Sequence, residues 1–277
     1  MYKPILITGA SSGIGEACAV HLAHKGFTVF AAARRLDVLK DLSGLGGGRI
    51  HPVQMDVTSS TSIREALGQI AEHTSTPLFG LINNAGVSVM GPVERVDIDE
   101  WKRLYETNVF GLVQVTQAVL PQMREEGLGR IINIGSVAGR IVMPFFSPYA
   151  SSKHAVEGIS DGLRRECEPL GIRVSHIRPG FINTQFGVQE HKSLEPHMQE
   201  GEPYSDAVQK FNAWHERGHP NASPPSQVAQ VVYHALTASK PHSRYTVPKK
   251  YMGYLALRNT MPSAVVDRIL ARTIAKG

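Results

Sequence analysis

Gly9-Ala10-Ser11-Ser12-Gly13-Ile14-Gly15 follows a short apolar run, Ile5 to Thr8, and precedes a helical pattern from Glu16 to about Lys25. A strand, a glycine-rich turn and a helix in this order are the context of a dinucleotide-binding loop. The stretch therefore predicts an α/β fold with a dinucleotide site at this turn. A plain glycine turn is the alternative interpretation.

The three glycines of this loop have separate roles. Gly9 allows a tight turn, Gly13 lets the backbone approach a pyrophosphate, and Gly15 lets the helix pack against the strand. The first N–H groups of the helix are free, and its dipole is positive at this end, so both favour a bound phosphate. The spacing is Gly-x-x-x-Gly-x-Gly, which differs from the Gly-x-Gly-x-x-Gly of most dinucleotide folds.

The residues after the second predicted strand bear on the choice of cofactor. Phe27 to Ala33 reads as this strand, and Arg34 and Arg35 follow it. A carboxylate at this point would bind the ribose 2′-hydroxyl of NAD. Two guanidinium groups favour a 2′-phosphate instead, and hence NADP. A solvated arginine pair is the alternative.

Two further predicted strands end in polar or small residues. Arg49 to Met55 ends at Asp56-Val57, and Leu78 to Ile82 ends at Asn83-Asn84-Ala85-Gly86. Parallel sheets bind ligands at the carboxyl ends of their strands. Asp56 could accept a hydrogen bond from adenine, or could cap the next helix through Thr58 and Ser59.

Two polar residues stand out in the middle of the chain. Asn108 interrupts the interior of a long predicted helix, Trp101 to Arg124. Asparagine is unfavourable there because its amide competes for backbone groups, so a functional role is favoured. Ser136 follows a fifth predicted strand, Arg130 to Ile134, and precedes Tyr149 by thirteen residues. We expect the two hydroxyl groups to lie at one crevice.

Tyr149 and Lys153 are four residues apart at the start of a predicted helix. Positions i and i+4 share one helical face. A nearby ammonium group stabilises a phenolate and lowers the pKa of tyrosine, which suits a general acid for a carbonyl oxygen. By itself, the pair is more often a solvated face.

The remaining segments complete the predicted sheet and its cover. Ile172 to Ile177 and Tyr245 to Val247 read as strands, and Ile63 to His73 and Pro225 to Ala238 read as helices. Gln185 to Ser223 is polar and irregular, which is typical of a lid or a binding loop. The tail from Tyr251 to Ile274 is apolar and basic, and Pro262 breaks it. Two small helices are expected there.

Composition narrows the functional class. The 277 residues are 42% hydrophobic and carry a net charge of +5, but no run of five basic residues indicates a nucleic-acid footprint. Cys18 and Cys167 match no metal spacing, so we expect free buried thiols in a reducing cytosol. A strand follows Met1 almost at once, and no apolar run reaches the roughly 18 residues of a spanning helix, so neither a signal peptide nor a membrane span is expected.

The motifs together resemble those of the short-chain dehydrogenase/reductase family, in particular its single-domain members. The resemblance covers roughly residues 4 to 184, and it rests on Thr8 to Gly15, Asn83-Asn84-Ala85-Gly86, Asn108, Ser136, Tyr149-x-x-x-Lys153 and Pro179-Gly180. We therefore expect a doubly wound Rossmann fold, with a seven-stranded, mostly parallel sheet and helices on both faces. One domain would span residues 1–277, with a substrate-binding lid at 181–223 and a helical tail at 251–277.

The resemblance implies a catalytic tetrad of Asn108, Ser136, Tyr149 and Lys153 and no metal. It implies cofactor contacts from Tyr149, Lys153, Gly9, Ser11, Ser12, Gly13, Ile14, Gly15, Arg34, Arg35, Asp56, Val57, Asn84, Ala85, Gly86, Pro179, Gly180, Ile182 and Thr184. Arg34 matches a basic position of NADP-preferring members. Many of these members also carry a basic residue where this chain has Ser12, so NAD stays an alternative to NADP.

The expected reaction is hydride transfer between NADP(H) and a ketone, an aldehyde or a secondary alcohol. The tail resembles that of hydroxysteroid- and retinol-type members, so a bulky apolar substrate is expected. An apolar pocket is predicted from Phe145, Phe146, Phe181, Phe186 and Trp214. The alternatives are a non-catalytic NADP-binding sensor or scaffold, and a dehydratase or epimerase. By analogy, we expect a cytoplasmic homodimer or homotetramer that pairs through the helices at 101–124 and 152–168.

Overall fold

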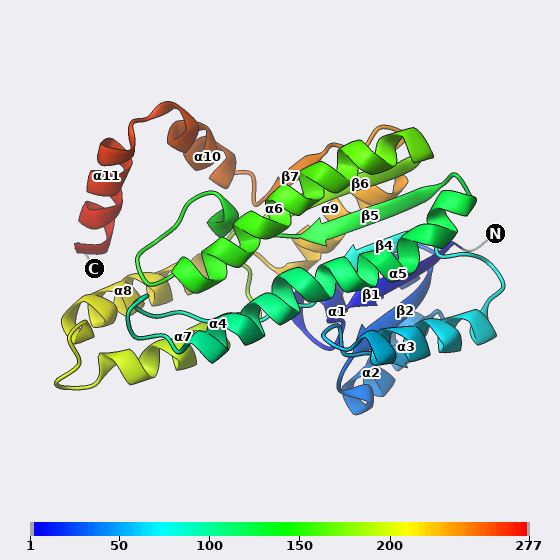
Figure 1. The fold of residues 1–277 in the computed structure, drawn as a ribbon, viewed down its shortest axis with the longest axis horizontal. Helices are drawn as coiled ribbons and strands as arrows, with labels where there is room; N and C mark the ends of the chain where they lie inside the picture. The colour runs from blue at the N-terminus through cyan, green and yellow to red at the C-terminus, as the bar shows by residue number, and fades with distance from the viewer. Residues whose placement is uncertain (1–2, 276–277) are drawn as a thin grey trace.

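Seven strands form one sheet in the order β3-β2-β1-β4-β5-β6-β7, in a computed structural model that describes residues 3–275 (Figure 1). Every pair of neighbouring strands is parallel, so the predicted seven-stranded, mostly parallel sheet is confirmed and is in fact wholly parallel. The strands are β1 (Pro4–Thr8), β2 (Thr28–Ala33), β3 (Ile50–Gln54), β4 (Gly80–Asn83), β5 (Gly129–Ile134), β6 (Ile172–Pro179) and β7 (Arg244–Val247).

Helices cover both faces of the sheet, as in a doubly wound Rossmann fold. Successive side chains of a strand point to opposite faces, so Ile5 and Ile7 pack in one hydrophobic core and Leu6 packs in the other. The first core lies under α1 (Gly13–His24), α2 (Leu36–Ser43) and α9 (Pro225–Thr237). The second lies under α3 (Ser60–His73), α5 (Gly111–Glu125) and α6 (Ser147–Cys167).

The predicted long helix at 101–124 is one helical rod with a change of pitch. It consists of α4 (Ile98–Tyr105), a π-helical turn (Glu106–Phe110) and α5. Asn108 lies within the π turn, which explains why an asparagine is found in the middle of this helix. The predicted strands agree closely with the observed ones, but sequence reasoning missed α2, whose buried residues are Leu39 and Leu42.

The segment predicted to be irregular is mostly helical, so this expectation is wrong. It forms α7 (Phe186–Leu194) and α8 (Ser205–Gly218). The buried face of α8 carries Asn212 and His215 beside Val208 and Phe211, so its apolar periodicity is weak. The tail forms α10 (Tyr251–Thr260) and α11 (Ser263–Ala275), and short 3₁₀ turns lie at Gly44–Gly46, Val137–Gly139, Glu168–Leu170, Glu195–Met198 and His219–Asn221.

The sheet reverses its order beside β1, and this reversal creates the site. The chain runs outward from β1 to β2 and β3, and then returns to place β4 on the other side of β1. The loops after β1 and β4 therefore diverge, and they leave a crevice at the carboxyl ends of the strands. In Figure 1 the arrow of β5 points toward the side of the molecule that carries α7 and α8.

A buried polar network fixes α6 against the sheet. Asn83 Nδ2 donates to Thr116 Oγ1 (2.9 Å) and to Asn133 Oδ1 (3.0 Å). Asn133 Nδ2 in turn donates to Ser160 Oγ on α6 (2.9 Å). Buried amides of this kind are costly unless they are paired, so the network favours one register of the helix.

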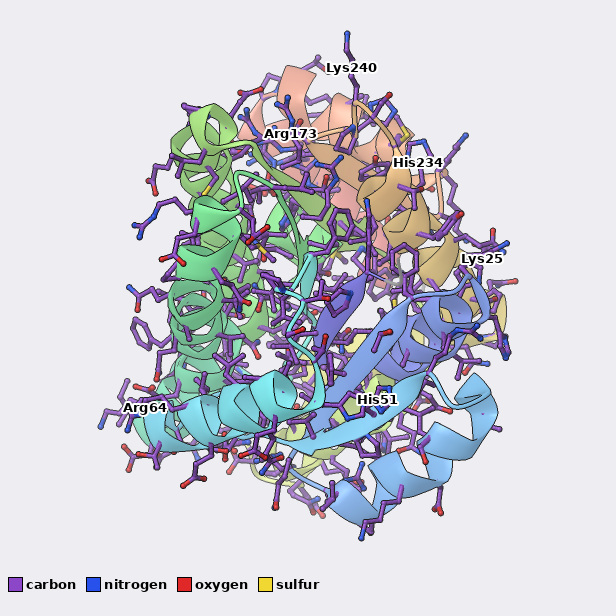
Figure 2. All side chains as sticks on the ribbon, turned by 90° about the vertical axis from the view of Figure 1, so that its right-hand side faces the viewer. Lys25, His51, Arg64, Arg173, His234 and Lys240 are labelled. Atoms are coloured by element: carbon purple, nitrogen blue, oxygen red, sulfur yellow. The ribbon has the colours of Figure 1, made fainter. Side chains whose placement is uncertain are left out.

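Other properties expected from composition are visible on the described residues. Cys18 and Cys167 are buried and free, as predicted. No helix between residues 3 and 275 has both the length and the apolar character that crossing a bilayer requires. Figure 2 looks at the side that is on the right in Figure 1, and its labelled side chains Arg64 and Lys25 lie toward opposite edges of that view, with Arg173 and Lys240 at the top.

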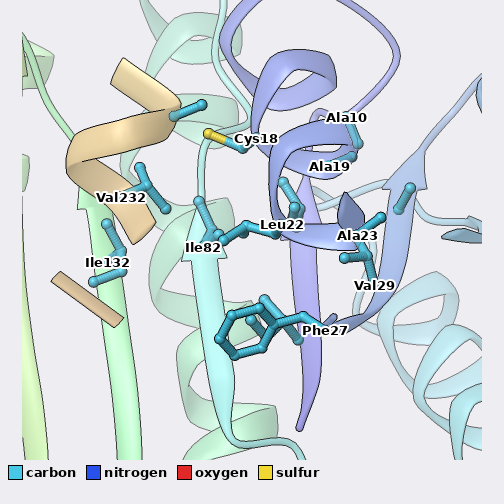
Figure 3. Packing of buried hydrophobic residues seen from close by; sticks show 14 of the residues in the cluster. Ala10, Cys18, Ala19, Leu22, Ala23, Phe27, Val29, Ile82, Ile132 and Val232 are labelled. Carbon is cyan, nitrogen blue, oxygen red and sulfur yellow. The ribbon is translucent and has the colours of Figure 1, made fainter. Parts of the chain in front are cut away.

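Leu22 tests the packing of α1 on the sheet. Its side chain is fully buried and points from α1 toward β4, where Ile82 lies (Figure 3). We expect Leu22→Ala to lower the free energy of unfolding by about 2–5 kcal/mol, because the substitution leaves a cavity. Urea denaturation measures the change, and Leu45→Ala, at a side chain that is 56% exposed, serves as the control. Equal effects of the two substitutions would contradict this packing.

Candidate active site

The Tyr149–Lys153 pair lies on the first turns of α6, at the carboxyl edge of the sheet. Both residues are buried, with 7% and 5% of their surface exposed. Lys153 Nζ lies 5.7 Å from the centroid of the Tyr149 ring, and it donates to the carbonyl oxygen of Ile134 at the end of β5 (3.1 Å). The predicted spacing on one helical face therefore brings phenol and ammonium together.

Ser136 joins this pair from the end of β5. Its side chain forms a hydrogen bond with that of Tyr149. Ser136 Oγ also accepts from the backbone N–H of Ala138 (3.1 Å) and donates to the carbonyl oxygen of Pro179 (3.5 Å). These contacts fix the Ser136 hydroxyl between two strand ends and α6, so it faces the same crevice as Tyr149.

Asn108 reaches the pair through a residue that sequence reasoning missed. Asn108 Oδ1 accepts from the N–H of Val87 (2.8 Å), and its Nδ2 donates to the carbonyl oxygen of Val87 (2.9 Å) and to Ser152 Oγ (3.1 Å). Ser152 Oγ then donates to the carbonyl oxygen of Tyr149 (2.7 Å). No sequence pattern marked Ser152, which reads as an ordinary helical serine.

The expected lowering of the pKa of Tyr149 is wrong in this structure. Burial raises the pKa of its hydroxyl well above the usual value, the carboxylate of Glu190 raises it further, and the hydrogen bond with Ser136 lowers it only in part. Burial also lowers the pKa of Lys153 to about 8. Removal of water disfavours both charged forms, and here it outweighs the attraction between them.

The glycine-rich loop is packed against the end of β4. Gly9 and Gly13 have positive φ angles of 65° and 61°, which glycine adopts without strain. A methyl group on Gly9 would lie 2.7 Å from the Cα atom of Ala85, and one on Gly15 would overlap with the carbonyl oxygen of Gly9. These two positions therefore exclude a side chain.

Asn84 ties the two loops together. Its Nδ2 donates to the carbonyl oxygens of Thr8 and Gly9, each at 3.0 Å. Thr8 Oγ1 accepts from the N–H groups of Asn84 (3.0 Å) and Ala85 (3.1 Å). Thr8 therefore links the loop after β1 to the loop after β4. This role was not predicted, because a threonine at the end of a strand carries no specific signal.

The predicted cofactor residues lie on loops at the carboxyl ends of the strands. A methyl group placed on Gly13 would meet the Thr184 side chain at 3.1 Å. One placed on Gly86 would lie 3.3 Å from Asn108 Oδ1 and 3.7 Å from Lys153 Nζ. Ser12 occupies the N-cap position of α1, in the loop that also holds Ser11 and Ile14, while Ile182 and Gly180 follow β6. A glycine cradle that leads to a buried lysine fits an extended dinucleotide.

The residues expected at the far end of the cofactor lie on neighbouring strand ends. Arg34 and Arg35 follow β2 and are exposed, and Asp56 and Val57 follow the adjacent strand β3. Asp56 Oδ1 accepts from the N–H and the hydroxyl of Thr58 (2.9 and 2.8 Å) in a local turn, whereas the N-cap of α3 is Ser59, so the interpretation of Asp56 as the cap of this helix is wrong. The structure thus places the basic pair at the same edge of the sheet as the glycine-rich loop.

Aromatic side chains cover Tyr149 on the side away from the sheet. The rings of Phe186 and Phe146 lie 5.6 and 6.0 Å from its ring. Phe145 and Trp214 pack in the same cluster, and Phe181 lies 6.3 Å from Trp214, so the five predicted pocket residues do gather here. Phe211 and Tyr204, aromatic residues of the predicted binding loop, also lie here. Glu190 and His215 were missed, because no sequence pattern marks either residue.

Phe145 has a φ angle of 65°, the left-handed region that bulky residues rarely adopt. Its carbonyl oxygen accepts from the N–H of Gly91 (2.8 Å), and its ring packs against Phe211 (5.6 Å). Strained backbone of this kind is concentrated at functional sites. Here it holds the loop before α6 against the loop that follows β4.

Comparison with known proteins agrees with this geometry. The family model described as short chain dehydrogenase matches residues 3–195. The mitochondrial D-beta-hydroxybutyrate dehydrogenase of Bos taurus is 35% identical over 96% of this chain and 83% of its own length. The NADPH-dependent 3-dehydrocapnine reductase of Ornithobacterium rhinotracheale is 32% identical over 98% of this chain and 97% of its own.

Among solved structures, a short-chain dehydrogenase from Streptomyces avermitilis superimposes with a TM-score of 0.80 and 28% identity, over 100% of this chain and 98% of that one. The family model covers well over half of the sequence, and the relatives align along nearly all of it. The chain therefore belongs to the short-chain dehydrogenase family, and it is an oxidoreductase of that family.

The lowered pKa of Lys153 predicts a specific dependence of stability on pH. Folded Lys153 releases its proton near pH 8, whereas an unfolded lysine holds it to about pH 10.4, so the unfolded chain binds more protons in this window and the contribution to stability rises with pH. We expect the stability of the wild type relative to Lys153→Met to increase by up to about 3 kcal/mol from pH 8 to pH 10.4.

Urea denaturation of both proteins across this range measures that difference. Lys40→Met, at an exposed lysine of α2, is the matched control, and its stability should stay parallel to that of the wild type. Parallel curves for Lys153→Met as well would show that Lys153 titrates normally.

Proposed function

We propose that this chain transfers a hydride between NADP(H) and a ketone, an aldehyde or a secondary alcohol that is bulky and apolar. The observation that carries the proposal is the hydrogen bond of Tyr149 with Ser136, with Lys153 Nζ 5.7 Å from the tyrosine ring, at the edge of the sheet that carries the glycine-rich loop. When bound, the nicotinamide supplies the hydride, so that a ketone, NADPH and a proton give a secondary alcohol and NADP⁺.

The proposed site for the dinucleotide runs from Arg34 to Lys153. The loop Gly9–Gly15 and the start of α1 would hold the pyrophosphate, with Thr184 over Gly13 and Asn84, Ala85 and Gly86 beneath it. Arg34 and Arg35 would bind a 2′-phosphate, which supports NADP over NAD. The name of the reductase relative, which specifies NADPH, supports the same choice.

Tyr149 would give a proton to the oxygen of the substrate. Its raised pKa keeps the phenol protonated at neutral pH, and this is the form that carbonyl reduction consumes. Ser136, whose hydroxyl meets that of Tyr149, would donate a second hydrogen bond to the same oxygen. Both donors would stabilise the negative charge that develops on this oxygen.

Lys153 and Asn108 would assist Tyr149 without touching the oxygen of the substrate. The ammonium group of Lys153 would bind the nicotinamide ribose and stabilise any phenolate that forms. Asn108 Oδ1 and Lys153 Nζ approach the same point beside Gly86, which supports a role for Asn108 in a water-mediated proton path from Lys153 to solvent. An Asn108→Leu variant with an unaltered pH profile would exclude such a path.

Residues 181–223 would form the lid over the substrate in the single domain of this chain. Phe186 on α7 covers Tyr149, and Phe211 and Trp214 on α8 extend the apolar wall. Ile274 of α11 packs against the same cluster, so the tail would contribute to its outer side. The wall supports an apolar substrate, and faster turnover of small hydrophilic ketones would exclude one.

We also propose a cytoplasmic homodimer or homotetramer that pairs through α4, α5 and α6. Phe110 and Leu170 are exposed apolar side chains at these helices, which supports a contact there. Light scattering of the purified chain measures the assembly, and a monomer at micromolar concentration would exclude it.

Tyr149→Phe tests the proposed general acid. Loss of the hydroxyl should lower kcat for NADPH-dependent ketone reduction by about 100-fold or more, the usual size of such a contribution. Absorbance of the reduced nicotinamide measures turnover, and Tyr233→Phe on α9 is the matched control. Near-normal turnover by a folded Tyr149→Phe protein would refute the assignment.

Arg34→Asp tests the choice of cofactor. A charge-assisted contact to a 2′-phosphate is worth about tenfold to a hundredfold in affinity, and a carboxylate there would bind the ribose hydroxyls instead. We expect the ratio of NADPH to NADH affinity to fall by at least about tenfold, as measured by fluorescence titration. Arg64→Asp on α3 is the control, and an unchanged ratio for Arg34→Asp would remove Arg34 from the site.

A further inference from the structure

Glu190 and His215 form a buried polar pair inside the aromatic cluster that covers Tyr149. Only 8% of Glu190 and 1% of His215 are exposed, and His215 Nε2 lies 3.3 Å from Glu190 Oε2. The His215 ring packs against Phe181 (5.2 Å), Phe146 (5.7 Å) and Phe211 (5.9 Å). A carboxylate in such apolar surroundings is expensive to bury.

The pair is not needed to hold α7 to α8. His191 on α7 already lies 3.2 Å from Asn212 Oδ1 and from Glu216 Oε1 on α8, near the surface. Replacing a buried ion pair by apolar side chains is often neutral or stabilising. Stability therefore does not explain the presence of a carboxylate at this position.

The position of Glu190 on its helix supplies another explanation. Phe186 and Glu190 are one turn apart on α7 and so share a face. The Phe186 ring lies 5.6 Å from the ring of Tyr149, and the charge of Glu190 acts on the Tyr149 hydroxyl. This face of α7 is thus directed at the proposed proton donor.

A substrate must meet the same face. Tyr149 is buried between the strand ends and α7, so a carbonyl group that reaches its hydroxyl lies beside Phe186 and Glu190. A carboxylate accepts hydrogen bonds from hydroxyl and ammonium groups, and it repels another carboxylate in a site without water. The aromatic rings around it would hold the apolar remainder of the molecule.

We propose that Glu190, oriented by His215, is the polar recognition group of the substrate site. It selects apolar ketones or alcohols that carry a hydrogen-bond donor, a hydroxyl or an amine, near the reacting carbon, and it rejects those that carry a carboxylate there. This inference rests on the proposed oxidoreductase function and specifies its substrate class.

The test uses three ketones. In each, the carbonyl carbon carries a heptyl group on one side and a CH2CH2X group on the other, where X is methyl, hydroxyl or carboxylate. NADPH oxidation by the full chain gives kcat/KM for each ketone. We expect the hydroxyl ketone to exceed the carboxylate ketone by about a hundredfold in the wild type, because one compound gains a charge-assisted hydrogen bond and the other meets a like charge. Equal values, or a preference for the carboxylate, would overturn the inference without any variant.

Glu190→Gln should reduce the ratio of hydroxyl to carboxylate ketone at least about tenfold, because the amide is neutral. Glu190→Asp keeps the charge and should retain most of the discrimination, which a purely structural role would not require. Glu195→Gln, at a carboxylate that is 55% exposed just after α7, should leave the ratio unchanged. A ratio in Glu190→Gln equal to that of the wild type would also overturn the inference.

Failure of the inference is distinguishable from failure of the proposed function. Turnover of the methyl ketone shows that the chain is a carbonyl reductase, whatever the effect of Glu190. Lack of NADPH oxidation with all three ketones would overturn the proposed function, and this inference with it.

Discussion

Exclusion of water from Tyr149 and Lys153 is the constraint on which the rest of this structure depends. It keeps the phenol of Tyr149 protonated and weakens the hold of the Lys153 amine on its proton, so the tyrosine rests in the form of a proton donor. The sheet alone does not produce this exclusion. It requires α7 and the aromatic rings of a segment that follows α6 in the chain by about twenty residues.

A site of this kind needs α6 to be fixed against the strand ends. The helix is attached at three levels: Ser160 to Asn133 of β5, Lys153 to the carbonyl oxygen of Ile134, and Tyr149 to Ser136. Each attachment is a buried hydrogen bond. If the helix slid, buried polar groups would be left without partners, and the free energy of unfolding would fall. The π turn at Asn108 adds a fourth through Ser152, so the packing that stabilises the fold is also what orients the site.

The candidate site was predictable where its signals are local. Two motifs can be interpreted from the backbone geometry of a few residues. They are the glycines at a strand-to-helix turn, and the tyrosine and lysine four residues apart. Asn108 was noticed because it breaks a helical rule, and the π turn is the physical reason for the exception. Thr8, Ser152, Glu190 and His215 were not predictable, because each acts through a partner remote in sequence and breaks no local rule.

The sequence by itself predicted the strands, the helices between them and a ligand site at the carboxyl ends of the strands, and its resemblance to a family predicted the doubly wound fold. The positions of the strands and helices follow from periodicity and turn chemistry. Only the tertiary structure decided what covers Tyr149, which way its pKa moves and which carboxylate faces it. The physical reason is that burial is a property of assembled elements: whether water reaches a side chain depends on helices from elsewhere in the chain, and no local pattern records their contact.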